Sequence, residues 1–432
     1  MSMSVLQPII EAESGCCSRA SLGAWQVSQL RKVLKEAKQK SRFYQNLLFG
    51  AVPENITNEA DLRTLPFTTS DMLRQHGMDF LTCPQKSIER IVTLKTSGTA
   101  GTAKRIFFSK SDIERTIDFF AVGMQEMVSK EDKVMILMPC RQENSVGDLL
   151  RRGLERIGTG IICGEAVKDV AETWGQMQKK RVSAVVGIPT QVLALAAYNE
   201  RQDASKRILL RTVLLSADMA PQVLKHRIAD SFRCEVFEHF GMTELCFGGA
   251  MECGAHTGGH IREADFLFEV IDPETGKPLP DGTEGELVVT TLQQRAMPLI
   301  RYRTGDLGVL LSDKCTCGSY IKRFLPTRGR ISDHWGSLSL SLLDDIIFQQ
   351  KDVIDYTAQQ RENELDIVLR GLCPLNEEKA YESLRKNENL RNMTIRLSSE
   401  AISGFSNTGM QKRHFTVGKG NEDIFTHIGI DT

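Results

Sequence analysis

The chain has 432 residues, of which 41% are hydrophobic and 25% charged, and its formal net charge is −1. This composition is typical of a folded globular protein, and the length predicts two or three domains. The near-neutral charge gives no electrostatic reason to expect a nucleic acid or an anionic membrane as partner.

No apolar run approaches the roughly 20 residues that span a bilayer, and the first residues lack a basic-then-apolar export signal. We therefore expect a cytoplasmic protein. In that compartment its 11 cysteines should be mostly reduced or metal-bound.

In chain order, the first predicted element is a helical segment over about residues 21–48, where apolar and charged positions recur at helical spacing. From about residue 92 to 240, short apolar runs alternate with amphipathic stretches. The apolar runs predict strands at 134–138, 160–162, 184–188 and 213–215, and the amphipathic stretches predict helices at 146–156, 170–180 and 221–232. This alternation predicts an α/β fold with a doubly wound, mostly parallel sheet. Ligands of such sheets bind beyond the carboxyl ends of the strands, where residues 216–218 and 237–244 fall.

The pattern changes after residue 250. Residues 266–271 and 286–292 flank a turn rich in Pro, Gly and Asp, which predicts a β-hairpin subdomain. Further strands are predicted at 365–369 and 393–397. We expect a large N-terminal domain over 1–328 and a small, mobile α+β domain over 329–432, with a hinge near Asp333.

Three short segments carry the candidate chemistry. The first contains Thr96, Ser97, Gly98, Thr99, Gly101 and Lys104. Its glycines let backbone N–H groups turn toward an anion, its hydroxyls add donors, and its lysine adds charge, which suits a triphosphate. The second, Phe-Glu-His-Phe-Gly-Met-Thr-Glu at 237–244, offers an aromatic face, a hydroxyl and a carboxylate. The third, Arg-Tyr-Arg-Thr-Gly-Asp at 301–306, ends in a carboxylate after a tight turn.

Each segment alone could be an ordinary loop, helix cap or turn. In this order and spacing, however, they resemble the adenylate-forming (AMP-binding) enzyme superfamily, and within it the phenylacetate–coenzyme A ligase branch. The resemblance implies activation of a carboxylic acid, aryl or arylalkyl, with ATP as an acyl-adenylate, followed by transfer of the acyl group to coenzyme A. The acid and coenzyme A would be the partners; the oligomeric state, a homodimer included, is left open.

The resemblance also implies roles for single residues. Lys104 would meet the β- and γ-phosphates, Thr243 the α-phosphate, and Asp306 the ribose hydroxyls. Glu244 would hold Mg²⁺, and Arg330 would reach ribose and phosphate. The purine pocket and the motif beside it would comprise Ser216, Ala217, Asp218, Glu238, His239, Phe240, Gly241 and Met242.

The resemblance also implies a catalytic lysine near the C-terminus, which swings in to meet the charge that develops on the carboxylate and the α-phosphate. This lysine is harder to place in this chain. Lys412 lies in a segment that resembles its neighbourhood, but strict register puts the lysine at Met410. Either the loop is shifted and Lys412 serves, or the lysine is absent and the first half-reaction is slow. An exposed surface lysine is the plain alternative.

Other positions also depart from the family pattern. Ala103 replaces the usual proline before Lys104, and Ala100 replaces a common threonine. Residues 138–147, near the expected acyl pocket, are unusually polar, and the loop after Asp333 is about three residues shorter than the family's. Phenylacetate itself is therefore not implied as the substrate.

A separate set of residues favours a structural Zn²⁺ site. Three thiolates and one imidazole, from Cys253, His260, Cys315 and Cys317, make a tetrahedral ligand set. His256 is a competing fourth ligand, and four unrelated residues with free thiols are the alternative. One branch of the resembling family carries a similar Cys/His pattern.

Two further functions stay open at this stage. One is an adenylyltransferase of the deazaflavin-coenzyme synthetase type, which leaves AMP on an acceptor hydroxyl. The other is a degenerate nucleotide-binding accessory protein. Release of pyrophosphate that depends on an acid would exclude the accessory protein, and formation of an acyl-CoA would exclude the adenylyltransferase.

Overall fold

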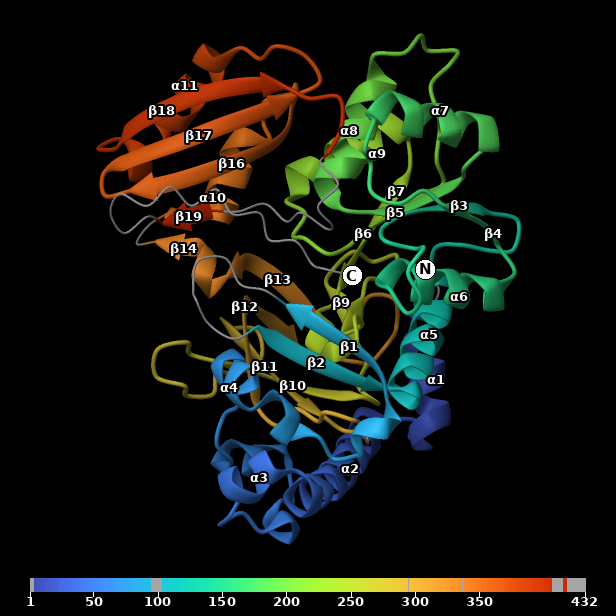
Figure 1. Ribbon diagram of the computed structural model, residues 1–432, viewed down its shortest axis with the longest axis vertical. Coiled ribbons are helices and arrows are strands. Elements are labelled where there is room, and N and C mark those ends of the chain that lie inside the picture. The colour runs from blue at the N-terminus through green and yellow to red at the C-terminus, as the bar shows by residue number, and fades with distance from the viewer. Residues whose placement is uncertain (1–3, 95–102, 294, 336–337, 406–414, 418–432) are drawn as a thin grey trace.

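The structure, a computed structural model, describes residues 4–94, 103–293, 295–335, 338–405 and 415–417 (Figure 1). A large sheet with helices on both sides forms most of it, and a smaller sheet follows toward the C-terminus. None of the helices in these ranges is long and apolar enough to cross a membrane.

The N-terminal segment is helical, as predicted, and packs along the large sheet. Its helices are α1 (Leu6–Ser14), α2 (Arg19–Lys40), α3 (Arg42–Leu47) and α4 (Ser70–His76), with 3₁₀ turns at Pro53–Asn55, Glu59–Thr64, Gly77–Phe80 and Gln85–Ser87. Ser18 begins α2 through a capping box with Ser21. Tyr44 is fully buried, and its hydroxyl donates to the Pro298 carbonyl at 3.1 Å, which ties α3 to the sheet.

The predicted doubly wound half of the sheet is confirmed. Five parallel strands lie in the order β4-β3-β5-β6-β7. Their bounds are β3 (Lys133–Leu137), β4 (Gly160–Cys163), β5 (Ala184–Gly187), β6 (Thr212–Leu215) and β7 (Glu235–Phe240). Helices α5 (Lys110–Met124), α6 (Val146–Ile157), α7 (Val170–Lys180), α8 (Pro189–Glu200) and α9 (Gln222–Phe232) accompany them. Strands β5 and β6 are buried along their whole length, as a sheet covered on both faces requires.

The other half of the sheet is antiparallel. It continues from β7 through β8 (Ala250–Met251), β9 (Gly259–Ile261), β13 (Arg323–Arg330), β12 (Tyr302–Leu311), β11 (Glu284–Thr291) and β10 (Phe266–Ile271). The predicted hairpin is therefore present as β10 and β11, but it forms the outer edge of the same 11-stranded sheet and not a separate subdomain.

A two-stranded hairpin holds the glycine-rich motif. Strands β1 (Ile88–Leu94) and β2 (Lys104–Ser109) are antiparallel, and Leu94 pairs with Lys104 across the loop. The residues that flank the glycine-rich motif are therefore held side by side.

The C-terminal segment has its own four-stranded sheet in the order β18-β17-β16-β19, with bounds β16 (Val353–Arg361), β17 (Glu364–Gly371), β18 (Thr394–Ala401) and β19 (Phe415–Val417). The short hairpin β14 (His334–Trp335) and β15 (Leu338–Ser339) leads to α10 (Leu340–Ile347), and α11 (Glu377–Lys386) follows β17. The division of the chain at residue 328 stays a prediction.

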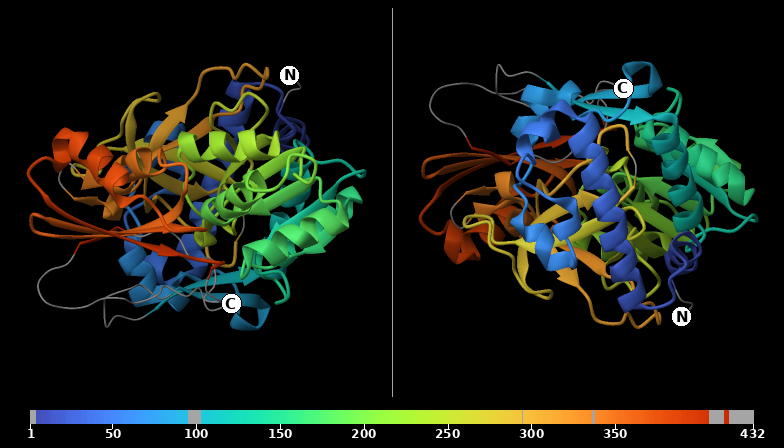
Figure 2. Two further views of the ribbon diagram at one scale, coloured as in Figure 1. Left: turned by 90° about the horizontal axis from the view of Figure 1, so that it is seen from above. Right: turned by 90° about the horizontal axis from the view of Figure 1, so that it is seen from below.

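The C-terminal sheet is not detached from the rest of the molecule. It lies on the side of α8 in Figure 1, and the further views of Figure 2 also show it against the helices of the N-terminal part. Apolar residues of these helices and of β16 and β17 form one continuous core. Main-chain bonds also cross between the parts: Val170 N donates to Ser403 O at 2.8 Å, and Phe405 N donates to Val167 O at 2.9 Å.

Two features were not anticipated from the sequence. Helix α8 is buried on nearly every side, so it lacks the polar stripe by which an amphipathic helix is recognised. Cys140, in the loop after β3, and Cys163, the last residue of β4, form a disulfide with Cα atoms 6.0 Å apart. This pair is an exception to the expectation that the cysteines are mostly reduced or metal-bound, and the other nine are free.

Candidate active site

The predicted motif residues gather beyond the carboxyl ends of β6 and β7. Residues 216–218 follow β6, and Ala217 there adopts a left-handed backbone with φ of 73°. After β7 the chain turns at Gly241, where a Cβ atom would lie 2.2 Å from the Phe247 carbonyl oxygen. Only glycine fits that close approach, so Gly241 lets the Thr243–Leu245 turn fold back against β7.

Lys104 and Glu244 meet in a buried ion pair. They are 140 residues apart in the sequence, yet their side chains are only 10% and 4% exposed and in direct contact. Burial alone would raise the pKa of Glu244, but the charge of Lys104 outweighs it and holds this pKa below its ordinary value. Glu244 is therefore a carboxylate, paired with a cation at the exit of the glycine-rich loop.

Tyr302 completes this group. Its hydroxyl donates to Glu244 Oε1 at 3.1 Å from the start of β12. Burial and the neighbouring carboxylate raise the pKa of Tyr302 well above its ordinary value, so the hydroxyl keeps its proton. The sequence analysis quoted Tyr302 within the third motif but gave it no role; two buried polar partners for one carboxylate could not be read from spacing.

Asp306 and Arg330 are also brought together. They are cross-strand partners on β12 and β13, and Arg330 Nε lies 3.5 Å from Asp306 Oδ1. Arg330 Nη2 also donates to the Thr304 carbonyl at 2.7 Å. The Asp306 carboxylate raises the pKa of Arg330, and Glu244 adds to the effect. Asp306, Arg330 and Glu244 thus belong to one electrostatic group.

Several residues predicted for the purine pocket have partners of their own. Glu238 accepts from Lys225 Nζ at 2.6 Å, and burial raises the pKa of Glu238. Asp218 Oδ1 accepts from the Met219 amide at 2.9 Å. The Phe240 ring packs edge-on to Phe324 with centroids 4.7 Å apart. The assignment of these side chains to adenine stays a prediction.

Ser216 and His239 line an apolar pocket. Ser216 Oγ and His239 Nδ1 share a hydrogen bond of 3.0 Å. Phe119, Phe120, Met138 and Leu214 are among the walls of this pocket. Burial lowers the pKa of His239 to about 4, so the imidazole is neutral near pH 7.

Some predicted residues cannot be placed. Lys412, Met410 and the loop residues Thr96, Ser97, Gly98, Thr99 and Gly101 lie outside the described residues. Their roles stay predictions.

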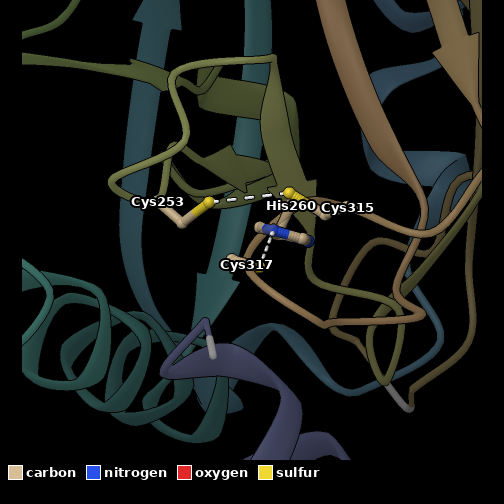
Figure 3. A group of neighbouring side chains, drawn as sticks. All are labelled: Cys253, His260, Cys315 and Cys317. Carbon is tan, nitrogen blue, oxygen red and sulfur yellow. Dashed lines mark hydrogen bonds between the residues drawn. The ribbon is translucent and has the colours of Figure 1, made fainter. Parts of the chain in front are cut away.

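The four predicted zinc ligands form one buried cluster (Figure 3). Cys253 follows β8, His260 lies in β9, and the two remaining cysteines lie in the β12–β13 loop. Their ligand atoms are all within 4.8 Å of one another. His256 points elsewhere: its ring nitrogens lie 3.1 Å from Glu235 and 3.4 Å from Glu252.

The distances in this cluster suit a metal ion with tetrahedral coordination. Cys253 Sγ and Cys315 Sγ are 3.8 Å apart, and zinc–sulfur bonds of about 2.3 Å in a tetrahedron place two sulfurs about 3.8 Å apart. Cys317 Sγ lies 3.4 Å from His260 Nε2. Burial lowers the pKa of His260 to about 4, so its imidazole is neutral and can act as a ligand.

Comparisons with known proteins show the family to which the chain belongs. The sequence model of the AMP-binding enzyme family matches residues 30–294. A phenylacetate–coenzyme A ligase of Pseudomonas putida is 28% identical over 94% of this chain and 88% of its own length. That of Escherichia coli (strain K12) is 30% identical over 67% of both chains.

A 2-hydroxyisobutyryl-CoA ligase structure in the postadenylation state has the same fold, with a TM-score of 0.78 and 18% identity over 93% of this chain and 90% of its own. The family inferred from three short motifs is therefore confirmed: the chain belongs to the AMP-binding enzymes and is similar to the phenylacetate–coenzyme A ligases among them.

Proposed function

We propose that this chain is an AMP-forming acid–coenzyme A ligase, which activates a carboxylic acid with ATP as an acyl-adenylate and transfers the acyl group to coenzyme A. The family membership supports the reaction class. The observation that carries the proposal in this structure is the buried Lys104–Glu244 pair with its Tyr302 contact, beside Asp306 and Arg330.

The charge of each residue indicates which part of the nucleotide it would bind. Lys104 and Arg330 would hold phosphate oxygens, and Asp306 would accept hydrogen bonds from the ribose hydroxyls, as carboxylates do with paired hydroxyls. Thr243, in the turn that follows β7, would donate its hydroxyl to the α-phosphate, the role that the family resemblance implies for it. Fixed donors and cations at that place stabilise the charge that builds up when the carboxylate attacks.

Glu244 would hold Mg²⁺. The residue fits, because it is a buried carboxylate kept ionised by its surroundings, and hard divalent cations prefer such oxygen ligands. Mg²⁺, when bound, would offset the negative charge of the phosphates. In this structure Lys104 forms an ion pair with Glu244. Binding of Mg²⁺ to Glu244 would break this pair and release Lys104 toward the nucleotide.

Zn²⁺ would have a structural role in Cys253, His260, Cys315 and Cys317. Four protein ligands leave no open position for a water molecule. The cluster joins the β8–β9 connection to the β12–β13 loop and does not include the nucleotide-binding motifs.

Pyrophosphate release across a panel of aryl, arylalkyl and short alkyl acids, with and without coenzyme A, tests the proposal. We expect release that depends on one class of acid, and acyl-CoA formation when coenzyme A is present. Release without acyl-CoA, with AMP left on an acceptor, would instead identify an adenylyltransferase. No release with any acid would indicate a nucleotide-binding accessory protein.

A further inference from the structure

The apolar pocket beyond the carboxyl ends of β5, β6 and β7 has one polar corner. Of the described residues that line it, only Ser216 and His239 carry polar side chains. The opposing walls come from α5 and α6, including Phe119, Phe120 and Leu150. A ligand in this pocket would therefore meet hydrocarbon on most sides and hydrogen-bonding groups on one.

The imidazole of His239 is held in a fixed orientation. Its Nδ1 atom bonds to Ser216 Oγ at 3.0 Å. The rings of Phe119 and Phe120 pack against it with centroids 5.9 Å and 6.0 Å away. Its other nitrogen, Nε2, is buried and has no hydrogen-bond partner among the residues that the structure describes.

A buried ring nitrogen without a partner costs free energy that a bound ligand can recover. His239 lies five residues before Glu244, the partner of Lys104, on strand β7, which leads into the adenylation motif. The acyl part of the acid would have to extend from that motif into a neighbouring apolar pocket, and this pocket adjoins it.

We propose that the pocket selects a monocarboxylic acid whose acyl part is apolar except for one hydroxyl group, and that His239 Nε2 binds that hydroxyl. The inference rests on the proposed function and adds the substrate class. It also moves His239 and Ser216 from the purine pocket to the acyl pocket.

The chemistry of the corner favours a hydroxyl over other groups. Ser216 can donate to Nδ1 or accept from it, so Nε2 is a donor in one tautomer and an acceptor in the other. A hydroxyl can pair with either form, whereas a carbonyl or an ammonium pairs with only one. A second carboxylate or an ammonium would be buried among apolar side chains with no opposite charge in the lining, which is costly.

The test uses matched acids that differ by one hydroxyl: phenylacetate against its 2-, 3- and 4-hydroxy derivatives, and benzoate against the hydroxybenzoates. We expect the kcat/KM of pyrophosphate release to favour one hydroxylated isomer over its parent by about tenfold or more, since a site built around a hydroxyl discriminates against the analogue that lacks it.

Variants then assign the preference to a residue. His239→Leu should remove the preference, and His239→Gln, whose amide can still reach the hydroxyl, should restore part of it. His226→Leu, on the exposed face of α9, is the matched control and should keep it. If His239 instead contacts the reacting carboxylate, His239→Leu will slow parent and hydroxylated acids equally, and the proposal is wrong.

The two proposals fail in different ways. If no acid releases pyrophosphate, the proposed function fails, and calorimetric titration of the same acids onto the protein still tests the pocket. A wild-type protein that binds or activates the parent acids as well as every hydroxylated one overturns the inference and leaves the ligase function standing.

Discussion

Glu244 is the residue at which three parts of the chain meet: the turn after β7, Lys104 at the start of β2 and Tyr302 at the start of β12. The sequence marked it as a metal ligand, and the structure adds a cation and a phenol as its partners. A side chain with two buried polar partners has little freedom, so small changes at this position should have large effects.

Glu244→Gln should keep the fold but slow adenylation by roughly two to three orders of magnitude, because the anionic ligand for Mg²⁺ is lost and the remaining charges are no longer balanced. The measurement is pyrophosphate release at saturating Mg²⁺. Glu274→Gln, in the exposed turn between β10 and β11, is the control. Equal rates for Glu244→Gln and wild type would show that the metal role is misassigned.

The ionisation of Glu244 should make the stability of the fold depend on pH. The pKa of Glu244 is lower in the folded protein than its ordinary value, so the Lys104–Glu244 pair stabilises the fold above the unfolded-state pKa. That contribution is lost as the pH falls through the folded-state pKa. Urea unfolding should therefore show a stability difference between wild type and Glu244→Gln that is largest near neutral pH and shrinks in acid. A difference that does not change with pH would contradict this.

At the scale of elements, the Cys/His cluster joins two connections that are far apart in sequence, β8–β9 and β12–β13. Protein purified without added metal should contain about one zinc per chain, measured by elemental analysis. His260→Ala should lose it, and His256→Ala, whose ring pairs with Glu235 and Glu252, should retain it.

Cys315→Ser should lower the thermal midpoint, because metal binding at such a site contributes to folding. Cys17→Ser, an exposed free cysteine, is the matched control and should leave the midpoint unchanged. ATP binding should persist in the variant, since the cluster is separate from the nucleotide-binding motifs. A well-folded sample without metal would end the zinc hypothesis.

Elements with a clear period could be predicted from the sequence. Predicted residues 170–180 coincide with α7, and residues 146–156 end one residue short of α6. Helix α8 was missed because it is buried all round, so hydrophobicity does not alternate along it. The cross-strand pairing that unites the antiparallel strands with the parallel ones is set by tertiary contacts and leaves no local pattern.

In the candidate site, too, some features could be predicted from the sequence and others could not. Glu244, Asp306 and Arg330 could be found because a motif surrounds each of them. The unpartnered Nε2 of His239 could not, because it depends on side chains from α5, α6, β6 and β7 that only the fold brings together.

For the whole molecule, the C-terminal sheet packs on α8 and α9 through a shared apolar core. Gly404 passes so close to the N-terminal part that a Cβ atom there would lie 1.8 Å from the Lys168 carbonyl oxygen. The resemblance implies that the C-terminal part rotates between the two half-reactions. In that case these contacts exist in one of its two positions and must break before it reaches the other.

Arg227 makes several hydrogen bonds across that interface. From α9 it donates to the carbonyls of Phe348, Gln350 and Val353 at 3.3, 3.4 and 2.7 Å, and also to that of Lys351. Arg227→Ala should lower the free energy of unfolding by about 2 kcal/mol, because several charge-assisted bonds are lost. Hydrogen exchange should become faster over residues 348–361.

Arg396→Ala provides the matched control, since the ion pairs of Arg396, with Glu364 and Asp366, lie inside the C-terminal sheet. It should leave exchange over residues 348–361 unchanged. Because Arg227→Ala weakens one position of the swing, it should also change the ratio of pyrophosphate release to thioester formation, measured with a chemically made acyl-adenylate for the second step. If Arg227→Ala shows the same hydrogen exchange over residues 348–361 and the same ratio of the two rates as wild type, the Arg227 contacts do not hold the C-terminal sheet in place.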